Sequence, residues 1–144
     1  MLTQDKQKLF FDANIFVAYS NKQDSCFLKA KKILEWADEN KAKIFSLDLV
    51  IYEVLTVVSL RCGKKNSLTF GKSIFKKREV AIIEKSKKLE KSAWQIFQKV
   101  KSKNFSFVDA FILASLKQNP WLTLVSFDKR LVKEAKKLRL KIYP

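Results

Sequence analysis

The sequence predicts an α/β fold in three layers, α/β/α, with a central parallel β-sheet flanked by helices. Short apolar runs of strand length alternate with helical patterns along the 144 residues, and this alternation is typical of parallel sheets. No internal repeat and no Pro/Gly-rich linker divides the chain. Apolar residues make up 47% of it, enough to build a core at this length. We therefore expect a single domain over residues 1–144.

The first half of the chain predicts two strands and two helices. KLFFD (8–12) has the length and the aromatic content of a buried strand. Residues 24–40 form a helical pattern, and KIFS (43–46) reads as a second strand. Ser46 then has the chemistry to cap a helix that extends to about Leu60. The apolar face of the helix over 24–40 comprises Phe27, Ala30, Ile33, Leu34 and Ala37.

The second half predicts further helices and two more strands. Residues 66–77 are expected to be helical. Residues 80–103 have the pattern of one long amphipathic helix, although VAIIE (80–84) also fits a short strand. Four elements complete the chain: a buried helix over 107–119 stopped by Pro120, a strand over 122–126, a helix over 128–138 and a strand over 140–143.

The charge of the chain is extreme. Thirty Lys and Arg against 14 Asp and Glu give a formal charge of +16, which attracts polyanions such as nucleic acid. Only four of the thirty are arginine, so the excess favours contact with a phosphate backbone over the reading of bases. A lysine-biased composition without functional meaning is the alternative.

The stretch 64–103 is the candidate nucleic-acid-binding surface, because it holds thirteen Lys and Arg against three Glu. Trp94 and Phe97 within it could stack on bases. The stripe formed with Ala93 and Val100 favours the other interpretation, in which both aromatic residues face the core.

Several classes of function are excluded or disfavoured by composition. The chain has no histidine, which excludes Ser-His-Asp triads and His-ligated zinc. No apolar run approaches the roughly 20 residues that span a bilayer, and the N-terminus lacks the pattern of a signal peptide. Cys26 and Cys62 are isolated, as in a protein with reduced thiols. We expect a cytoplasmic protein without membrane contact.

Four acidic residues stand among large apolar neighbours: Asp12 in LFFDANIF, Glu53 in VIYEVL, Asp109 in SFVDAFIL and Asp128 in LVSFDKRL. An ionised carboxylate in an apolar environment is costly unless it is paired or binds a metal. In parallel sheets, ligands bind at the carboxyl ends of the strands. All four acids fall near that edge in the predicted element order, which indicates a shared site for a divalent cation.

Each acid also has a structural interpretation. Asp12 and Asp128 could cap the helices that follow them. Glu53, with Leu49, Val50, Thr56 and Val57 around it, has the pattern of a core-facing residue and could form a buried pair with a lysine. Ser106 and Asp109 have the spacing of a capping box. These interpretations do not exclude metal binding by the same side chains.

The four segments together resemble the PIN-domain nucleases, and most closely their VapC-type toxin branch. FFDANIF resembles the opening strand with its Asp-x-Asn, VIYEVL the helix with the conserved Glu, FSFVDAFILAS the helix with the third acid, and LVSFDKRL the closing Thr/Ser-x-Asp. The segments occur in the family's order over nearly the whole chain. Ala13 stands where Thr or Ser is frequent, and Ser126 where Thr is commoner.

The resemblance implies a PIN-like domain acting as a Mg²⁺-dependent endoribonuclease, with Mn²⁺ as a substitute. Asp12, Glu53 and Asp109 would hold the metal, directly or through water, and Asp128 would complete the cluster. Three supporting residues would orient the carboxylates: Asn14, Ser106 and Ser126.

The resemblance also implies partners: an RNA substrate, a cognate antitoxin protein and a second copy of the chain. Two alternatives stay open. One is a PIN-like RNA-binding module without catalysis, and the other is an RNA-processing nuclease without a toxin role.

Overall fold

Five parallel strands form the centre of the protein in a computed structural model that describes residues 6–144. The expected domain starts at residue 1, and residues 1–5 lie outside the described part. The order across the sheet is β3-β2-β1-β4-β5. The strands are β1 (Lys8–Phe11), β2 (Lys43–Leu47), β3 (Ala81–Ile83), β4 (Thr123–Val125) and β5 (Lys141–Ile142).

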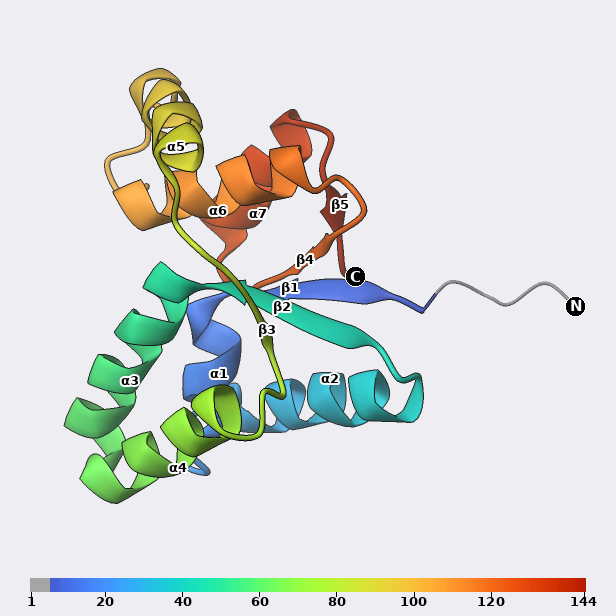
Figure 1. The fold of residues 1–144 in the computed structure, drawn as a ribbon, viewed down its shortest axis with the longest axis vertical. Helices are drawn as coiled ribbons and strands as arrows, with labels where there is room; N and C mark the ends of the chain where they lie inside the picture. The colour runs from blue at the N-terminus through green and yellow to red at the C-terminus, as the bar shows by residue number, and fades with distance from the viewer. Residues whose placement is uncertain (1–5) are drawn as a thin grey trace, which may run out of the picture.

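Helices cover both faces of this sheet, so the predicted three-layer α/β/α architecture is confirmed (Figure 1). One layer, below the sheet in Figure 1, contains α1 (Ala13–Tyr19), α2 (Phe27–Glu39), α3 (Asp48–Cys62) and α4 (Lys64–Phe75). The layer above contains α5 (Lys87–Lys99), α6 (Phe107–Gln118) and α7 (Lys129–Lys137). In residues 6–144, no helix is both long and apolar enough to cross a membrane.

The core is built around β1 and α6. Leu9, Phe10 and Phe11 of β1 are fully buried, as expected for a central strand with helices on both faces. All residues of α6 from Ala110 to Leu116 are buried as well. Because α6 and β1 are fixed by this packing, the polar residues at their ends are held in defined positions.

The chain changes direction across the sheet between β1 and β4. From β1 it proceeds outward to β2 and β3, and later returns to place β4 on the other side of β1. Phe11 of β1 lies opposite Val125 of β4, and the amide of Asp12 donates a 3.1 Å hydrogen bond to the carbonyl of Val125. Such a switch point is where open α/β sheets bind their ligands.

Ser46 does not cap a helix, so that sequence prediction is wrong. Strand β2 continues through Leu47, and α3 begins only at Asp48. The buried hydroxyl of Ser46 donates a 2.8 Å hydrogen bond to the carbonyl of Phe11 instead. The side chain of Ser46 therefore links β2 to the last residue of β1 by a hydrogen bond, directly beside Asp12.

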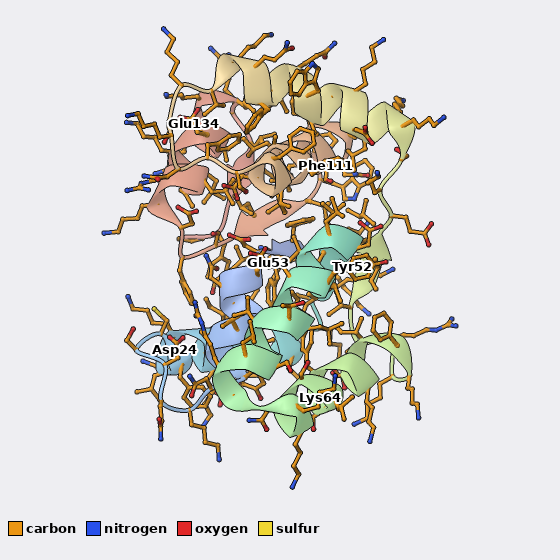
Figure 2. The ribbon with its side chains drawn as sticks, turned by 90° about the vertical axis from the view of Figure 1, so that its left-hand side faces the viewer. Asp24, Tyr52, Glu53, Lys64, Phe111 and Glu134 are labelled. Carbon is orange, nitrogen blue, oxygen red and sulfur yellow. The ribbon has the colours of Figure 1, made fainter. Side chains whose placement is uncertain are left out.

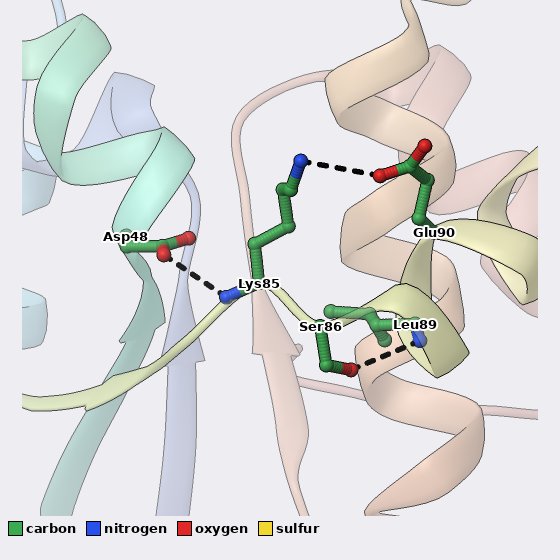
Figure 3. A network of polar contacts seen from close by, with 5 residues as sticks. All are labelled: Asp48, Lys85, Ser86, Leu89 and Glu90. Carbon is green, nitrogen blue, oxygen red and sulfur yellow. Dashed lines mark hydrogen bonds and ion pairs between the residues drawn. The ribbon is translucent and has the colours of Figure 1, made fainter.

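Residues 80–103 are not one helix, because the short strand that VAIIE also allowed is present as β3. Helix α5 starts after Ser86, whose hydroxyl accepts a 3.0 Å hydrogen bond from the amide of Leu89 (Figure 3). The amide of Lys85 donates a 2.9 Å bond to Asp48 at the start of α3, and the Lys85 ammonium lies 3.1 Å from Glu90. These contacts fix the segment that passes from one helical layer to the other.

The stretch 64–103 does not form one surface. Helix α4 packs against α3 in one layer, and α5 packs against α6 in the other. Its thirteen cationic residues are therefore divided between opposite ends of the molecule (Figure 1). Trp94 is 52% exposed, so its predicted core position is wrong, whereas its neighbour Ala93 is buried.

Candidate functional site

Four acidic residues from separate elements line one pocket of about 390 Å³ at the carboxyl-end rim of the sheet. They are Asp12, Glu53, Asp109 and Asp128, the set singled out in the sequence. Asp12 follows β1 and Glu53 belongs to α3, whereas Asp109 and Asp128 belong to the starts of α6 and α7. The pocket therefore lies where the two helical layers meet at the switch point.

Asp12 is the buried member of the set, with 7% of its surface exposed. Its Oδ1 accepts a 2.7 Å hydrogen bond from the amide of Ala13 at the start of α1. Its Oδ2 accepts a 2.7 Å bond from the hydroxyl of Ser126 and a 3.2 Å bond from the amide nitrogen of Asn14. The carboxylate of Asp12 thus caps α1 through Oδ1, while Ser126 and Asn14 fix its orientation through Oδ2.

Asn14 and Ser126 connect the ends of β1 and β4. The side-chain nitrogen of Asn14 also donates to the Ser126 hydroxyl at 3.2 Å, and its oxygen accepts from the amide of Phe127 at 3.1 Å. The hydroxyl of Ser126 in turn accepts from the amide of Asp128 at 3.0 Å. Asn14 and Ser126, two of the three residues expected to support the carboxylates, therefore contact the carboxylate of Asp12, and Ser126 also contacts the backbone amide of Asp128.

Burial raises the pKa of Asp12 to about 6. The hydrogen bonds from Ser126 and the amide of Ala13 favour the ionised form and oppose this shift. The nearby carboxylates of Asp109 and Asp128 add to it by repulsion. A shifted acid in a cleft is a typical property of a functional site.

Asp109 closes a capping box at the start of α6. Its Oδ2 accepts a 2.9 Å hydrogen bond from the amide of Ser106, and the Ser106 hydroxyl accepts a 3.0 Å bond from the amide of Asp109. Desolvation by partial burial raises the pKa of Asp109, against the effect of these hydrogen bonds. The capping interpretation is therefore correct, and the same side chain lines the pocket.

Asp128 caps α7. Its Oδ1 accepts hydrogen bonds of 2.9 Å from the amide of Arg130 and 3.3 Å from the amide of Leu131. Within the described residues, Oδ2 of Asp128 accepts no hydrogen bond from the protein. One oxygen of this carboxylate is therefore committed to the helix, and the other is available to a ligand.

Glu53 is exposed and does not face the core, so the core-facing stripe was a wrong interpretation. The buried residues of α3 are Val50, Ile51, Val54 and Val58. Glu53 lies beside that face, toward the gap between the two layers (Figure 2). No ion pair with a lysine forms at Glu53 in the part of the chain that the structure describes.

The donor chemistry of the pocket fits a hard cation that keeps part of its water shell. Within residues 6–144, no three His, Cys, Asp or Glu side chains are grouped closely enough to hold a metal by themselves. Mg²⁺ does not need such a cage, because it is often bound by one or two carboxylates with waters in the other positions. Asp12 and the free oxygen of Asp128 offer carboxylate ligands, with Asp109 and Glu53 at the rim.

The family model described as the PIN domain matches residues 9–138, which include all of these side chains. The chain belongs to the PIN domain family. The resemblance seen in the four acidic segments is thereby confirmed at the level of the family.

Solved structures share the PIN fold at low sequence identity. VapC20 of Mycobacterium tuberculosis, a sarcin-ricin loop cleaving toxin, superposes with a TM-score of 0.77 at 22% identity, over 87% of this chain and 93% of that chain. FitAcB of Neisseria gonorrhoeae gives 0.67 at 16% identity, over 94% and 96%. VapBC2 of Rickettsia felis, bound to a DNA fragment from their promoter, gives 0.64 at 18%, over 95% and 98%. Among curated protein sequences, no significant match was found.

The pocket of this PIN domain also contains two charged residues that the sequence reasoning missed. Arg61 and Asp24 both line it, and Arg61 is the one cationic residue among the described lining residues. Arg61 lies two turns beyond Glu53 on the same face of α3. That spacing is the signal that could have identified it. Asp24 carries no comparable signal because its neighbours are polar.

Proposed function

We propose that this PIN domain is a Mg²⁺- or Mn²⁺-dependent endoribonuclease and the toxin of a toxin–antitoxin pair. The observation that carries the proposal is the convergence of Asp12, Glu53, Asp109 and Asp128 on one pocket at the switch point of the sheet. Asp12, Asp109 and Asp128 also cap helices, but capping alone does not require that carboxylates from four separate elements line one pocket. They are suited to holding a divalent cation.

The proposed metal ligands are the four acids, which would act directly or through water. A divalent cation held there supplies a water of lowered pKa and neutralises charge on the phosphate. Asn14 and Ser126 fix the orientation of Asp12 through their hydrogen bonds. Ser106 does the same for Asp109 through the capping box.

The rest of the pocket is suited to bring an anionic substrate to these acids. Arg61 offers planar, fixed donors to a phosphate oxygen at the margin of the pocket. The charge of +16 over the whole chain favours the approach of RNA and offsets repulsion by the acids. Cleavage is therefore expected to weaken as salt concentration rises.

The toxin role and the partners are supported by similarity. VapC20, with the same fold, is a sarcin-ricin loop cleaving toxin, and VapBC2 was solved bound to a DNA fragment from their promoter. For the present chain we propose a folded RNA substrate, a cognate antitoxin that blocks the acidic pocket, and a homodimeric state. Growth arrest on induced expression, relieved by the product of a neighbouring short reading frame, would distinguish a toxin from an RNA-processing enzyme.

The decisive experiment is cleavage of a total small-RNA pool with Mn²⁺. The wild-type chain is compared with Asp12→Asn and Asp109→Asn, and with Asp38→Asn on the exposed side of α2 as a matched control. We expect discrete fragments from the wild type and the control alone, abolished by EDTA. If all four proteins bind RNA equally and none cuts it, the nuclease proposal fails and the RNA-binding module replaces it.

A further inference from the structure

A second cavity, of about 730 Å³, lies between α5, α6 and α7 in the layer opposite α3 and α4. Five lysines from these helices and the segment after α5 surround it. We call it the lysine pocket, and its cationic residues are Lys99, Lys101, Lys117, Lys133 and Lys137. Ser92, Gln95 and Ser102 add polar groups to the lining.

Among the described residues that line this cavity, Glu134 is the single acidic one. Its side chain is only 15% exposed and lies 3.2 Å from the ammonium of Lys137. The other four lysines have no ion-pair partner within the described residues. Figure 2 shows Glu134 in the layer of α5 to α7, away from Glu53 and the acidic pocket.

The lysines have a structural role that explains part of this charge. Lys99, Lys117 and Lys137 lie in the last turns of α5, α6 and α7, where a cation complements the helix dipole. Each helix end contributes roughly half a negative charge. Three such ends and Glu134 together offset about half of the five positive charges. A net positive charge of roughly two to three remains around the hollow, and Lys101 and Lys133 lie outside any last turn.

Helices α6 and α7 connect the two pockets, because each contributes residues to both. On α6, Asp109 lines the acidic pocket, and Leu113 and Lys117 line the lysine pocket. Eight residues of helix separate Asp109 from Lys117, a rise of about 12 Å. Likewise, Asp128, the N-cap of α7, lines the acidic pocket, and Lys133 and Lys137 of that helix line the lysine pocket. An extended polyanion can therefore contact both pockets at once.

We propose that the lysine pocket binds backbone phosphates of the RNA strand, a few nucleotides away from the bond that is cleaved in the acidic pocket. Ammonium groups attract phosphate as point charges and do not form the planar fork that reads a base. The pocket thus adds affinity and position without sequence preference. This inference rests on the proposed ribonuclease function for the location of the cleaved bond.

The test compares Lys117→Gln/Lys133→Gln with the matched control Lys29→Gln/Lys32→Gln on exposed positions of α2. Binding of a fluorescein-labelled RNA is measured in EDTA at several salt concentrations, and cleavage kinetics are measured with Mn²⁺. For the pocket variant we expect a rise of about tenfold in Kd and KM, an unchanged kcat, and a salt slope lower by about two. The control is expected to change Kd less than about threefold, the part that comes from net charge alone.

Three outcomes distinguish the explanations. Equal losses in the pocket variant and the control overturn the proposal, because net charge then explains binding. Unchanged RNA binding in the pocket variant also overturns the proposal. If inorganic tripolyphosphate then raises the Tm of the wild type but not that of the pocket variant, the pocket binds a small free polyanion instead. If the pocket variant binds RNA more weakly in EDTA and the control does not, RNA binding by the lysine pocket is supported even when no cleavage is seen. In that case only the ribonuclease proposal fails. Circular dichroism confirms that both variants remain folded.

Discussion

The hydroxyl of Ser126 donates a 2.7 Å hydrogen bond to Oδ2 of Asp12, and this contact joins the ends of two neighbouring strands, β4 and β1. The same hydroxyl accepts from the amide of Asp128. One serine therefore aligns the buried acid with the start of the helix that carries the next acid. The consequences for metal binding, catalysis and stability can each be measured.

Replacing Ser126 with alanine is expected to lower cleavage with Mn²⁺ by roughly 10- to 100-fold, because Asp12 loses a hydrogen bond that orients it. Ser126→Thr keeps the hydroxyl and should retain most activity. Ser59→Ala, on α3 outside the acidic pocket, is the control for removal of a hydroxyl. Equal activity of the alanine and threonine variants would show that the bond has no role in cleavage.

The raised pKa of Asp12 predicts that the metal-free protein loses stability as pH rises. Between about pH 4 and pH 6 the folded protein holds a proton that the unfolded chain has released, so the free energy of unfolding falls through this window. The shift of the pKa to about 6 corresponds to a loss of about 3 kcal/mol in the free energy of unfolding once the pH exceeds this window. Asp12→Asn should therefore raise the Tm in EDTA at about pH 7.5 but not at about pH 4. A variant that is destabilised equally at both pH values would contradict this account.

A divalent cation is expected to stabilise the folded chain through the same carboxylates. At a concentration of Mn²⁺ about 100 times its Kd, linkage gives about 2.7 kcal/mol, or a rise in Tm of several degrees. Asp12→Asn should abolish this rise, and Glu53→Gln should reduce it less, because Glu53 is exposed at the rim. Thermal denaturation with and without Mn²⁺ measures both effects. An undiminished rise in Asp12→Asn would place the cation elsewhere.

Variants of Ser106 and Asp109 are expected to distinguish the role of Asp109 in helix capping from its role in metal binding. Ser106→Ala removes the side chain that accepts from the amide of Asp109, at a cost of about 1 kcal/mol in the free energy of unfolding. Cleavage should fall only modestly, because the Asp109 carboxylate remains. Asp109→Asn should lower cleavage by about 100-fold or more at a similar cost in stability. Chemical denaturation and cleavage rates, measured on both variants, test whether the two roles are distinct.

The fold class and the choice of the four acids that line one pocket could be predicted from the sequence, because both depend on local patterns. Apolar runs identified the strands, and acids among apolar neighbours identified Asp12 and Asp109, which prove to be buried or partly buried. Glu53 was placed wrongly because α3 is apolar over more than one face, so periodicity could not show which side is exposed. The element order predicted that the four acids lie near one edge of the sheet, but the shape of the pocket could not be predicted, because it depends on how the two helical layers meet.

Two other outcomes have a tertiary origin. For residues 80–103 the pattern allowed either one long helix or a short strand at VAIIE, and the strand β3 forms because it pairs with β2, a contact that the local sequence could not show. The cationic stretch 64–103 was expected to make one surface because its charges are adjacent along the chain. The chain passes from one helical layer to the other at Lys85, so the two halves of this stretch lie in opposite layers.

The lengths of the outer strands determine how two copies of the chain can meet. At the two edges of the sheet, β3 has three residues and β5 has two. Edge strands this short offer few unpaired backbone groups, so a second copy gains little by extending the sheet, and edge-to-edge aggregation is disfavoured in the same way. The proposed homodimer is therefore expected to associate through side chains on its helices, leaving the hydrogen-bond ladder of each sheet unchanged.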